Sequence, residues 1–152
     1  FKIRKRPETK AMPVLVDSMN MAQEYLLPIP DDVKKKLIKP FWPGALTIIL
    51  HCIKVVVPKF VRGGGDELGV RMPDNLIMLK IIKEVGVPIL APSANLSGGK
   101  TPFSLNEVNK DLINMVDLVI HGECKTKKES TIIDCSQKPW KILRKGAVRV
   151  DF

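Results

Sequence analysis

The residues of this chain best suited to chemistry are arginines, hydroxyls and amides at the ends of predicted strands. Arginine suits phosphate because its planar fork donates hydrogen bonds in pairs, while hydroxyls and amides fix a ligand's orientation. Ligand crevices in open α/β sheets form at strand ends, so we expect these side chains to gather in one site. Taken singly, Arg4 and Arg6 are more typical of solvated terminal charges, while Arg71 and Arg144 are as consistent with surface positions as with ligand contact. The candidates are Arg4, Arg6, Arg71, Ser93, Asn95, Ser130, Thr131 and Arg144.

Side chains that serve as acids, bases or metal ligands are scarce. His51 falls within an apolar strand, and His121 lies at the end of a predicted strand; both are more typical of structural histidines. Neither a histidine pair at metal-binding spacing nor a GxSxG, GxGxxG or GxxxxGK[ST] motif is present. The sequence therefore predicts no side-chain nucleophile, no catalytic base and no protein-held metal.

Four helices should support this site, each with its own end signals. Ser18 can cap the first, Pro40 should stop the second, and Gly86 is placed to end the third. Ser104 and Glu107 have the spacing of a capping box for the fourth. The expected helices cover residues 18–25, 30–40, 74–86 and 104–116.

β-branched and apolar runs predict the strands of the sheet. Helices and strands alternate through the first two-thirds of the chain, and several short strands then close it. This order favours a single α/β domain with a mixed parallel and antiparallel sheet. The expected strands are 13–17, 45–53, 68–71, 88–90, 117–120, 130–135, 140–144 and 147–150.

Composition narrows the class of partner. The net charge of +9 favours a polyanionic partner such as nucleic acid or a nucleotide. It is equally consistent with a basic protein that binds no polyanion. An aromatic content of 5% argues against a platform that stacks single-stranded bases. The three cysteines, Cys52, Cys124 and Cys135, lack CxxC spacing, which favours a reducing, cytoplasmic compartment. No apolar run is long enough to predict a membrane span.

Taken together and in order, several segments resemble the YrdC family of threonylcarbamoyl-adenylate synthases. The combination of "FWPG", "PSANLSG" and "EST" is the most specific part of the resemblance. Matching blocks run from Arg4 to about Val148, nearly the whole chain. They are "RKRPETKAMPVLV", "FWPGALTIIL", "GVRMPDN", "PILAPSANLSGGKTP", "ESTIIDC" and "ILRKGAV".

The resemblance implies a twisted mixed α/β sheet with a basic concave cavity. It also implies a nucleotidyltransferase that makes threonylcarbamoyl-AMP from L-threonine, bicarbonate and ATP, with magnesium, and releases pyrophosphate. A separate transferase complex would then pass the threonylcarbamoyl group to tRNA. Because the substrates supply the nucleophile, such an enzyme mainly positions reactants and neutralises phosphate charge.

Site residues carry over by resemblance, position by position. The family's Lys-x-Arg motif falls on Arg4-Lys5-Arg6, so Arg replaces Lys at its first position, and its Ser-x-Asn motif falls on Ser93-Ala94-Asn95. The nucleotide would contact Arg4, Arg6, Ser93, Asn95, Thr101 and Arg144. The threonine would lie near Arg71, Ser130 and Thr131.

Two further readings stay open at this point. The family's Thr-Glu-Thr and Tyr-Gly-Leu segment has no match here, because the only tyrosine, Tyr25, lies in "QEYLLP". We therefore expect a single YrdC-like domain over residues 1–152 without the N-terminal part of the family domain. A non-catalytic module that binds tRNA or double-stranded RNA is the first alternative. A carbamoyl-transfer domain of hydrogenase maturation is the second.

Overall fold

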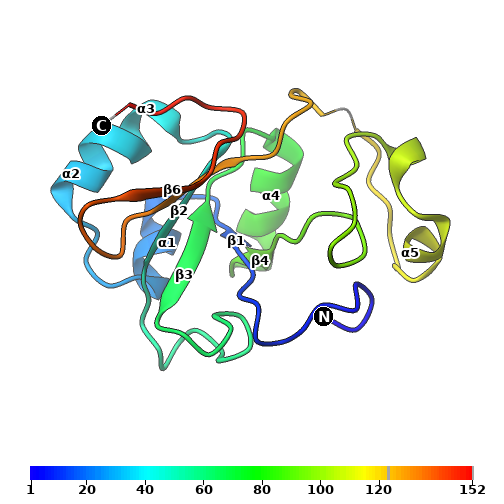
Figure 1. The fold of residues 1–152 in the computed structure, drawn as a ribbon, viewed down its shortest axis with the longest axis horizontal. Coiled ribbons are helices and arrows are strands. Elements are labelled where there is room, and N and C mark those ends of the chain that lie inside the picture. The colour runs from blue at the N-terminus through cyan, green and yellow to red at the C-terminus, as the bar shows by residue number, and fades with distance from the viewer. Residues whose placement is uncertain (123, 152) are drawn as a thin grey trace.

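A mixed six-stranded sheet forms the centre of the protein, in a computed structural model that describes residues 1–122 and 124–151 (Figure 1). The strand order is β4-β1-β3-β2-β5-β6. β1 pairs parallel with β3, and β2 pairs parallel with β5, whereas the other neighbours are antiparallel. The strands are β1 (Val14–Leu15), β2 (Leu46–His51), β3 (Glu67–Arg71), β4 (Ile89–Leu90), β5 (Thr131–Asp134) and β6 (Lys141–Arg144). The mixed α/β sheet expected from the sequence is confirmed.

The helices differ more from expectation than the strands do. Ser18 caps α1 by accepting from the Met21 N–H at 3.2 Å, and Gly86 ends α4 at a φ of 75°, as predicted. The helices are α1 (Met19–Tyr25), α2 (Asp31–Val33), the π-helical η1 (Lys34–Ile38), α3 (Lys39–Phe41), α4 (Leu76–Val85), the 3₁₀ turn η2 (Leu105–Glu107) and α5 (Lys110–Asn114).

The prediction that Pro40 stops the second helix is wrong. The chain stays helical from α2 through α3, and Pro40 lies inside α3. A proline ring clashes with the carbonyl four residues earlier in a regular α-helix. The preceding turn is π-helical, with the Lys39 N–H bonded to the Lys34 oxygen, and this wider turn accommodates the ring.

Three other predicted elements are also corrected. Residues 104–116 form η2 and α5 rather than one helix, because Val108 and Asn109 adopt extended ψ angles. The Glu107 carboxylate accepts from the Phe103 N–H at 3.0 Å. Residues 117–120 and 147–150 are not strands; Leu118 is 75% exposed, and no neighbouring strand in the described chain pairs with either segment.

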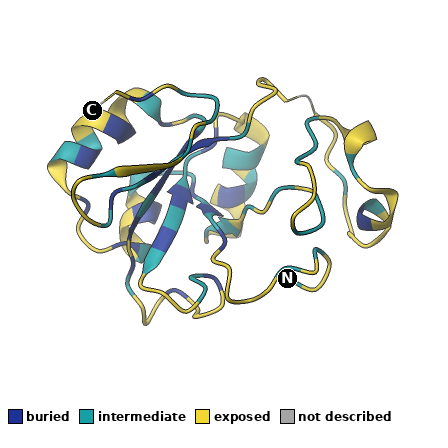
Figure 2. Ribbon diagram, viewed as in Figure 1, coloured by how far each residue is buried: buried dark blue, intermediate teal, exposed yellow. Residues whose placement is uncertain are grey.

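The two faces of the sheet have different roles, which follows from strand alternation. Side chains such as Ile48, Val70 and Ile133 are at most 1% exposed and form the core with α1, η1 and Trp42. Their neighbours in sequence point to the other face, which is only partly covered. Figure 2 shows the buried residues concentrated along the strands, while the α5 region is largely exposed. The open face is where the site lies.

No helix in the described part of the chain is both long enough and apolar enough to cross a bilayer.

Candidate active site

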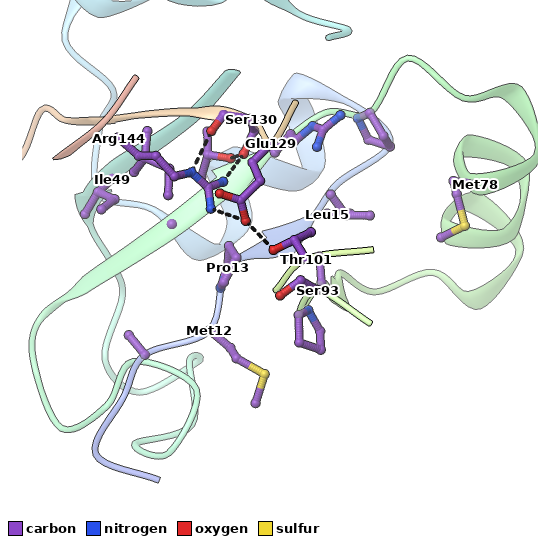
Figure 3. Close-up of a pocket in the computed structure, with 18 of the residues that line it drawn as sticks. Met12, Pro13, Leu15, Ile49, Met78, Ser93, Thr101, Glu129, Ser130 and Arg144 are labelled. Carbon is purple, nitrogen blue, oxygen red and sulfur yellow. Dashed lines mark hydrogen bonds and ion pairs between the residues drawn. The ribbon is translucent and has the colours of Figure 1, made fainter. Parts of the chain in front are cut away.

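A cavity of about 600 Å³ lies on the open face of the sheet. Its floor is a row of residues paired across the strands: Leu15 is opposite Arg71, and Thr47 is opposite Ile132, which is itself opposite Arg144. Its size falls within the range of small-molecule sites, about 300–1,000 Å³. The side wall comes from the N-terminal segment and from the loop after β4 (Figure 3).

Seven of the nine candidate residues line this cavity. They come from five separate parts of the chain, as expected if the strand ends and loops converge. The seven are Arg4, Arg6, Arg71, Ser93, Thr101, Ser130 and Arg144. Asn95 and Thr131 do not line it.

Thr131 lies on the core side of the sheet. Strand alternation sends Ser130 and Thr131 to opposite faces, and Thr131 is 2% exposed. Its hydroxyl donates to the Val148 oxygen at 2.6 Å and accepts from the Gly146 N–H at 3.1 Å. Thr131 therefore holds the segment after β6 against β5, whereas Ser130 faces the cavity.

Asn95 shapes the loop that carries Ser93. Its Oδ1 accepts from the Ser93 hydroxyl at 2.6 Å and from Arg4 Nη2 at 2.8 Å, and its amide nitrogen donates to the Gly99 oxygen. The loop is thus held by its own side chains before any ligand is bound.

Arg4 fastens the N-terminal segment to this loop. Its Nε donates to the Asn95 oxygen at 2.6 Å, and its backbone oxygen accepts from the Ser97 N–H at 2.9 Å. Burial lowers the pKa of the Arg4 guanidinium, with a further contribution from the nearby charge of Arg6. Arg6 folds back on its own segment and donates to the Ala11 oxygen at 2.7 Å.

Arg71 is positioned by the "FWPG" segment. Trp42 is almost buried and its Nε1 donates to the Leu46 oxygen at 2.8 Å, which fixes the chain just before β2. Gly44 then presents its oxygen to Arg71 Nε at 2.7 Å. Burial lowers the pKa of Arg71, and repulsion from Arg144 adds to this, so an anion placed between the two guanidinium groups would relieve the repulsion.

Arg144 lies at the end of β6 and is held by Ser130, the residue just before β5. Its Nε donates to the Ser130 oxygen and its Nη2 to the Ser130 hydroxyl, both at 2.9 Å. The Ser130 hydroxyl lies 3.0 Å from Thr47 Oγ1, so a chain of polar contacts runs across β6, β5 and β2.

Glu129 is a cavity residue that was not among the candidates from the sequence. Its carboxylate contacts Arg144 Nη1 at 3.1 Å and accepts from the Thr101 hydroxyl at 2.6 Å (Figure 3). It is the only acidic side chain among the described residues that line the cavity, against four arginines. Glu129 begins the "EST" segment, but its contacts with Thr101 and Arg144 are not visible in the sequence.

The protein is an α/β domain with a cavity lined by four arginines. The chain belongs to the Sua5/YciO/YrdC family, whose sequence pattern, described as "Telomere recombination", matches residues 1–146.

Similar proteins include the threonylcarbamoyl-AMP synthase of Pyrococcus abyssi, 36% identical over 99% of this chain and 44% of that protein. A putative threonylcarbamoyl-AMP synthase of Methanocaldococcus jannaschii is 35% identical, covering 99% of this chain and 69% of that protein. The chain spans less than half of the P. abyssi relative.

Solved structures agree with this assignment. The crystal structure of P. abyssi Sua5 complexed with L-threonine superposes with a TM-score of 0.89 at 36% identity, over 96% of this chain and 43% of that one. Escherichia coli YciO superposes with a TM-score of 0.80 at 25% identity, over 95% of this chain and 70% of that one. HypF, at 19% identity, shares the fold alone.

Proposed function

We propose that this chain carries the ATP-dependent synthesis of L-threonylcarbamoyladenylate. The observation that carries the proposal is the convergence of four arginines on one open-faced cavity, whose described lining has a single carboxylate and no histidine, cysteine or lysine. Such a site suits a reaction in which the protein positions reactants and neutralises phosphate charge. Relatives named threonylcarbamoyl-AMP synthase support the same reaction.

The proposed reaction needs no covalent intermediate on the protein. The threonine amine takes up bicarbonate with loss of water, and the resulting carbamate oxygen attacks the α-phosphorus of ATP. The bond from that phosphorus to the pyrophosphate oxygen breaks, and pyrophosphate leaves. Arg6, Ser93, Thr101 and Arg144 would bind the nucleotide, and Arg71 with Ser130 would bind the threonine. A tRNA-modifying transferase complex would consume the product.

Two candidate residues would act through others rather than by ligand contact. The hydrogen bonds of Asn95 and Thr131 are made within the protein, so we propose that both shape the site. The guanidinium of Arg4 is likewise engaged by Ser93 and Asn95, which makes it a clamp for the nucleotide loop.

Magnesium fits this site as part of the substrate. No group of three or more His, Cys, Asp and Glu residues in the described chain could hold a metal ion. Magnesium is usually bound by substrate phosphates, water and one or two carboxylates. We therefore propose that ATP enters the cavity as MgATP, with phosphate oxygens and water as the main ligands of the magnesium ion.

The cytoplasmic location stays a prediction from cysteine usage.

The test is pyrophosphate release by the full chain. Release should require L-threonine and bicarbonate together, and release that is indifferent to threonine would contradict the proposal. Arg144→Met should lower turnover by about 100-fold, because a positioned donor to developing charge is lost. Lys141→Met is the matched control, since Lys141 is an exposed cation on the same strand outside the cavity.

A further inference from the structure

Glu129 lies where three parts of the cavity wall meet. It precedes β5, contacts Arg144 at the end of β6, and accepts a hydrogen bond from Thr101 in the loop after β4 (Figure 3). The chain leaves the sheet after β4 and returns to it at β5. The contact from Thr101 to Glu129 therefore joins the start of this excursion to its end.

The guanidinium of Arg144 is held on all three of its nitrogens. Nε and Nη2 bond to Ser130, and Nη1 pairs with Glu129. A planar guanidinium bound on all three nitrogens has one orientation, whereas a guanidinium bound only by Ser130 would have no partner at Nη1. The Glu129 contact thus completes the orientation of Arg144.

The same carboxylate lowers the positive charge that a ligand meets. The side chains of Glu129 and Arg144 are 34% and 36% exposed, so their pair faces the cavity rather than the core. A phosphate approaching Arg144 would share Nη1 with Glu129 or displace it. Glu129 is in this sense an anion built into an anion-binding site.

We propose that Glu129 is a positioning residue that orients Arg144 and the Thr101 loop at the expense of nucleotide affinity. The proposal rests on the proposed function for its catalytic part, since it assigns a role within that same site. Its binding part concerns any polyphosphate in the cavity. Replacing a purely structural residue would lower both stability and nucleotide affinity. Replacing Glu129 should instead raise nucleotide affinity while it lowers turnover.

Glu129→Gln is the central variant. The amide keeps the size of the side chain and an acceptor for Thr101, but it removes the negative charge. ATP should bind about fivefold more tightly, because one charge near a polyanion is removed. Turnover should fall about tenfold, because a neutral amide oxygen holds Arg144 Nη1 more weakly than the charged carboxylate does. A lower KM together with a lower kcat is the expected signature.

Glu129→Asp and Thr101→Val separate the two contacts. Aspartate keeps the charge but is one methylene shorter, so affinity should stay near that of the parent chain while turnover falls. Valine at position 101 removes only the hydroxyl that donates to Glu129, so hydrogen–deuterium exchange over residues 93–101 should rise. Thr101→Ser retains the hydroxyl and should leave the exchange at the rate of the parent chain.

Inorganic tripolyphosphate, measured by calorimetry, tests the binding part without the reaction. If the parent chain releases no pyrophosphate but Glu129→Gln still binds tripolyphosphate more tightly, the proposed function fails and the binding role of Glu129 stands. If Glu129→Gln binds ATP and tripolyphosphate more weakly, the role assigned to Glu129 is wrong.

A metal-ligand role gives a different result. A rise in the Mg²⁺ concentration needed for half-maximal turnover in Glu129→Gln, with unchanged tripolyphosphate affinity, would overturn the proposal in favour of metal binding. If Glu129→Gln does not fold, Glu129→Asp decides, and weaker tripolyphosphate binding with unchanged turnover in that variant refutes the assignment.

Discussion

Replacing Gly146 by alanine should damage the fold and the site together. A Cβ at this position would lie 2.5 Å from the Ser130 carbonyl carbon and the Thr131 nitrogen, and it would also overlap the Glu129 oxygen. The backbone before β5 must therefore move, which costs about 1–3 kcal/mol as overpacking. The Ala147 N–H bond to the Glu129 oxygen, 2.8 Å long, would weaken as well, at about 0.5–1.5 kcal/mol.

The combined loss of about 3 kcal/mol should lower the melting temperature by about 6–12 °C for a chain of this size. Urea unfolding measures the free energy of unfolding. Pyrophosphate release should fall by more than the loss of folded protein explains, because Ser130 positions the Arg144 guanidinium. Gly122→Ala is the matched control, since a Cβ there meets nothing within 4 Å. Gly86→Ala tests left-handed strain without a clash, because its φ is 75° and its surroundings are open. Equal unfolding free energies for Gly146→Ala and Gly122→Ala would refute the reasoning.

Three other perturbations test separate parts of the structure. Arg4→Lys keeps the charge but loses the fork, so limited proteolysis of the loop at residues 93–99 should accelerate; unchanged cleavage would contradict the clamp. Gly69→Val should weaken ATP binding with little loss of stability. A Cβ at this position would have ordinary contacts of 3.4 Å or more, and the two methyl groups would enter the cavity. Unchanged ATP binding in calorimetry would contradict the placement of the ligand over Gly69. Burial raises the pKa of Cys135 to about 12, and that of Cys52 is raised as well, so at pH 8 a thiol reagent should label exposed Cys124 first and the other two only after denaturation.

The central strands were predictable because local pattern and tertiary environment agree there. The run from Leu46 to His51 is apolar and β-branched, and it lies between two strands, so nothing opposes its preference. Residues 117–120 have a similar composition, but no strand in the described part of the chain pairs with them, and isolated strand preference is not enough to form a strand. The stop predicted at Pro40 failed because a π turn absorbed the ring, and such a turn has no simple sequence signal.

The sequence predicted most of the residues that line the cavity, but not how their side chains are arranged. Arginines and hydroxyls at strand ends converge, since the strands share one sheet. The side of the sheet on which each residue falls was readable from alternation, and applying it would have separated Thr131 from Ser130. The role of Glu129 depended on contacts with Thr101 and Arg144, which are 28 residues away and on the next strand, respectively, and such distant pairs cannot be read from a single sequence.

One face of the sheet packs in the core and the other forms the cavity floor. Even positions of β2 therefore matter for stability, and odd positions matter for the site. Substitutions at Leu46, Ile48 and Leu50, all at most 5% exposed, should reduce the amount of folded protein. Substitutions at Thr47 and Ile49, which line the cavity, should leave abundance higher and reduce turnover. A mutational scan read by both abundance and activity should therefore oscillate with a period of two along this strand, with the two readouts out of phase.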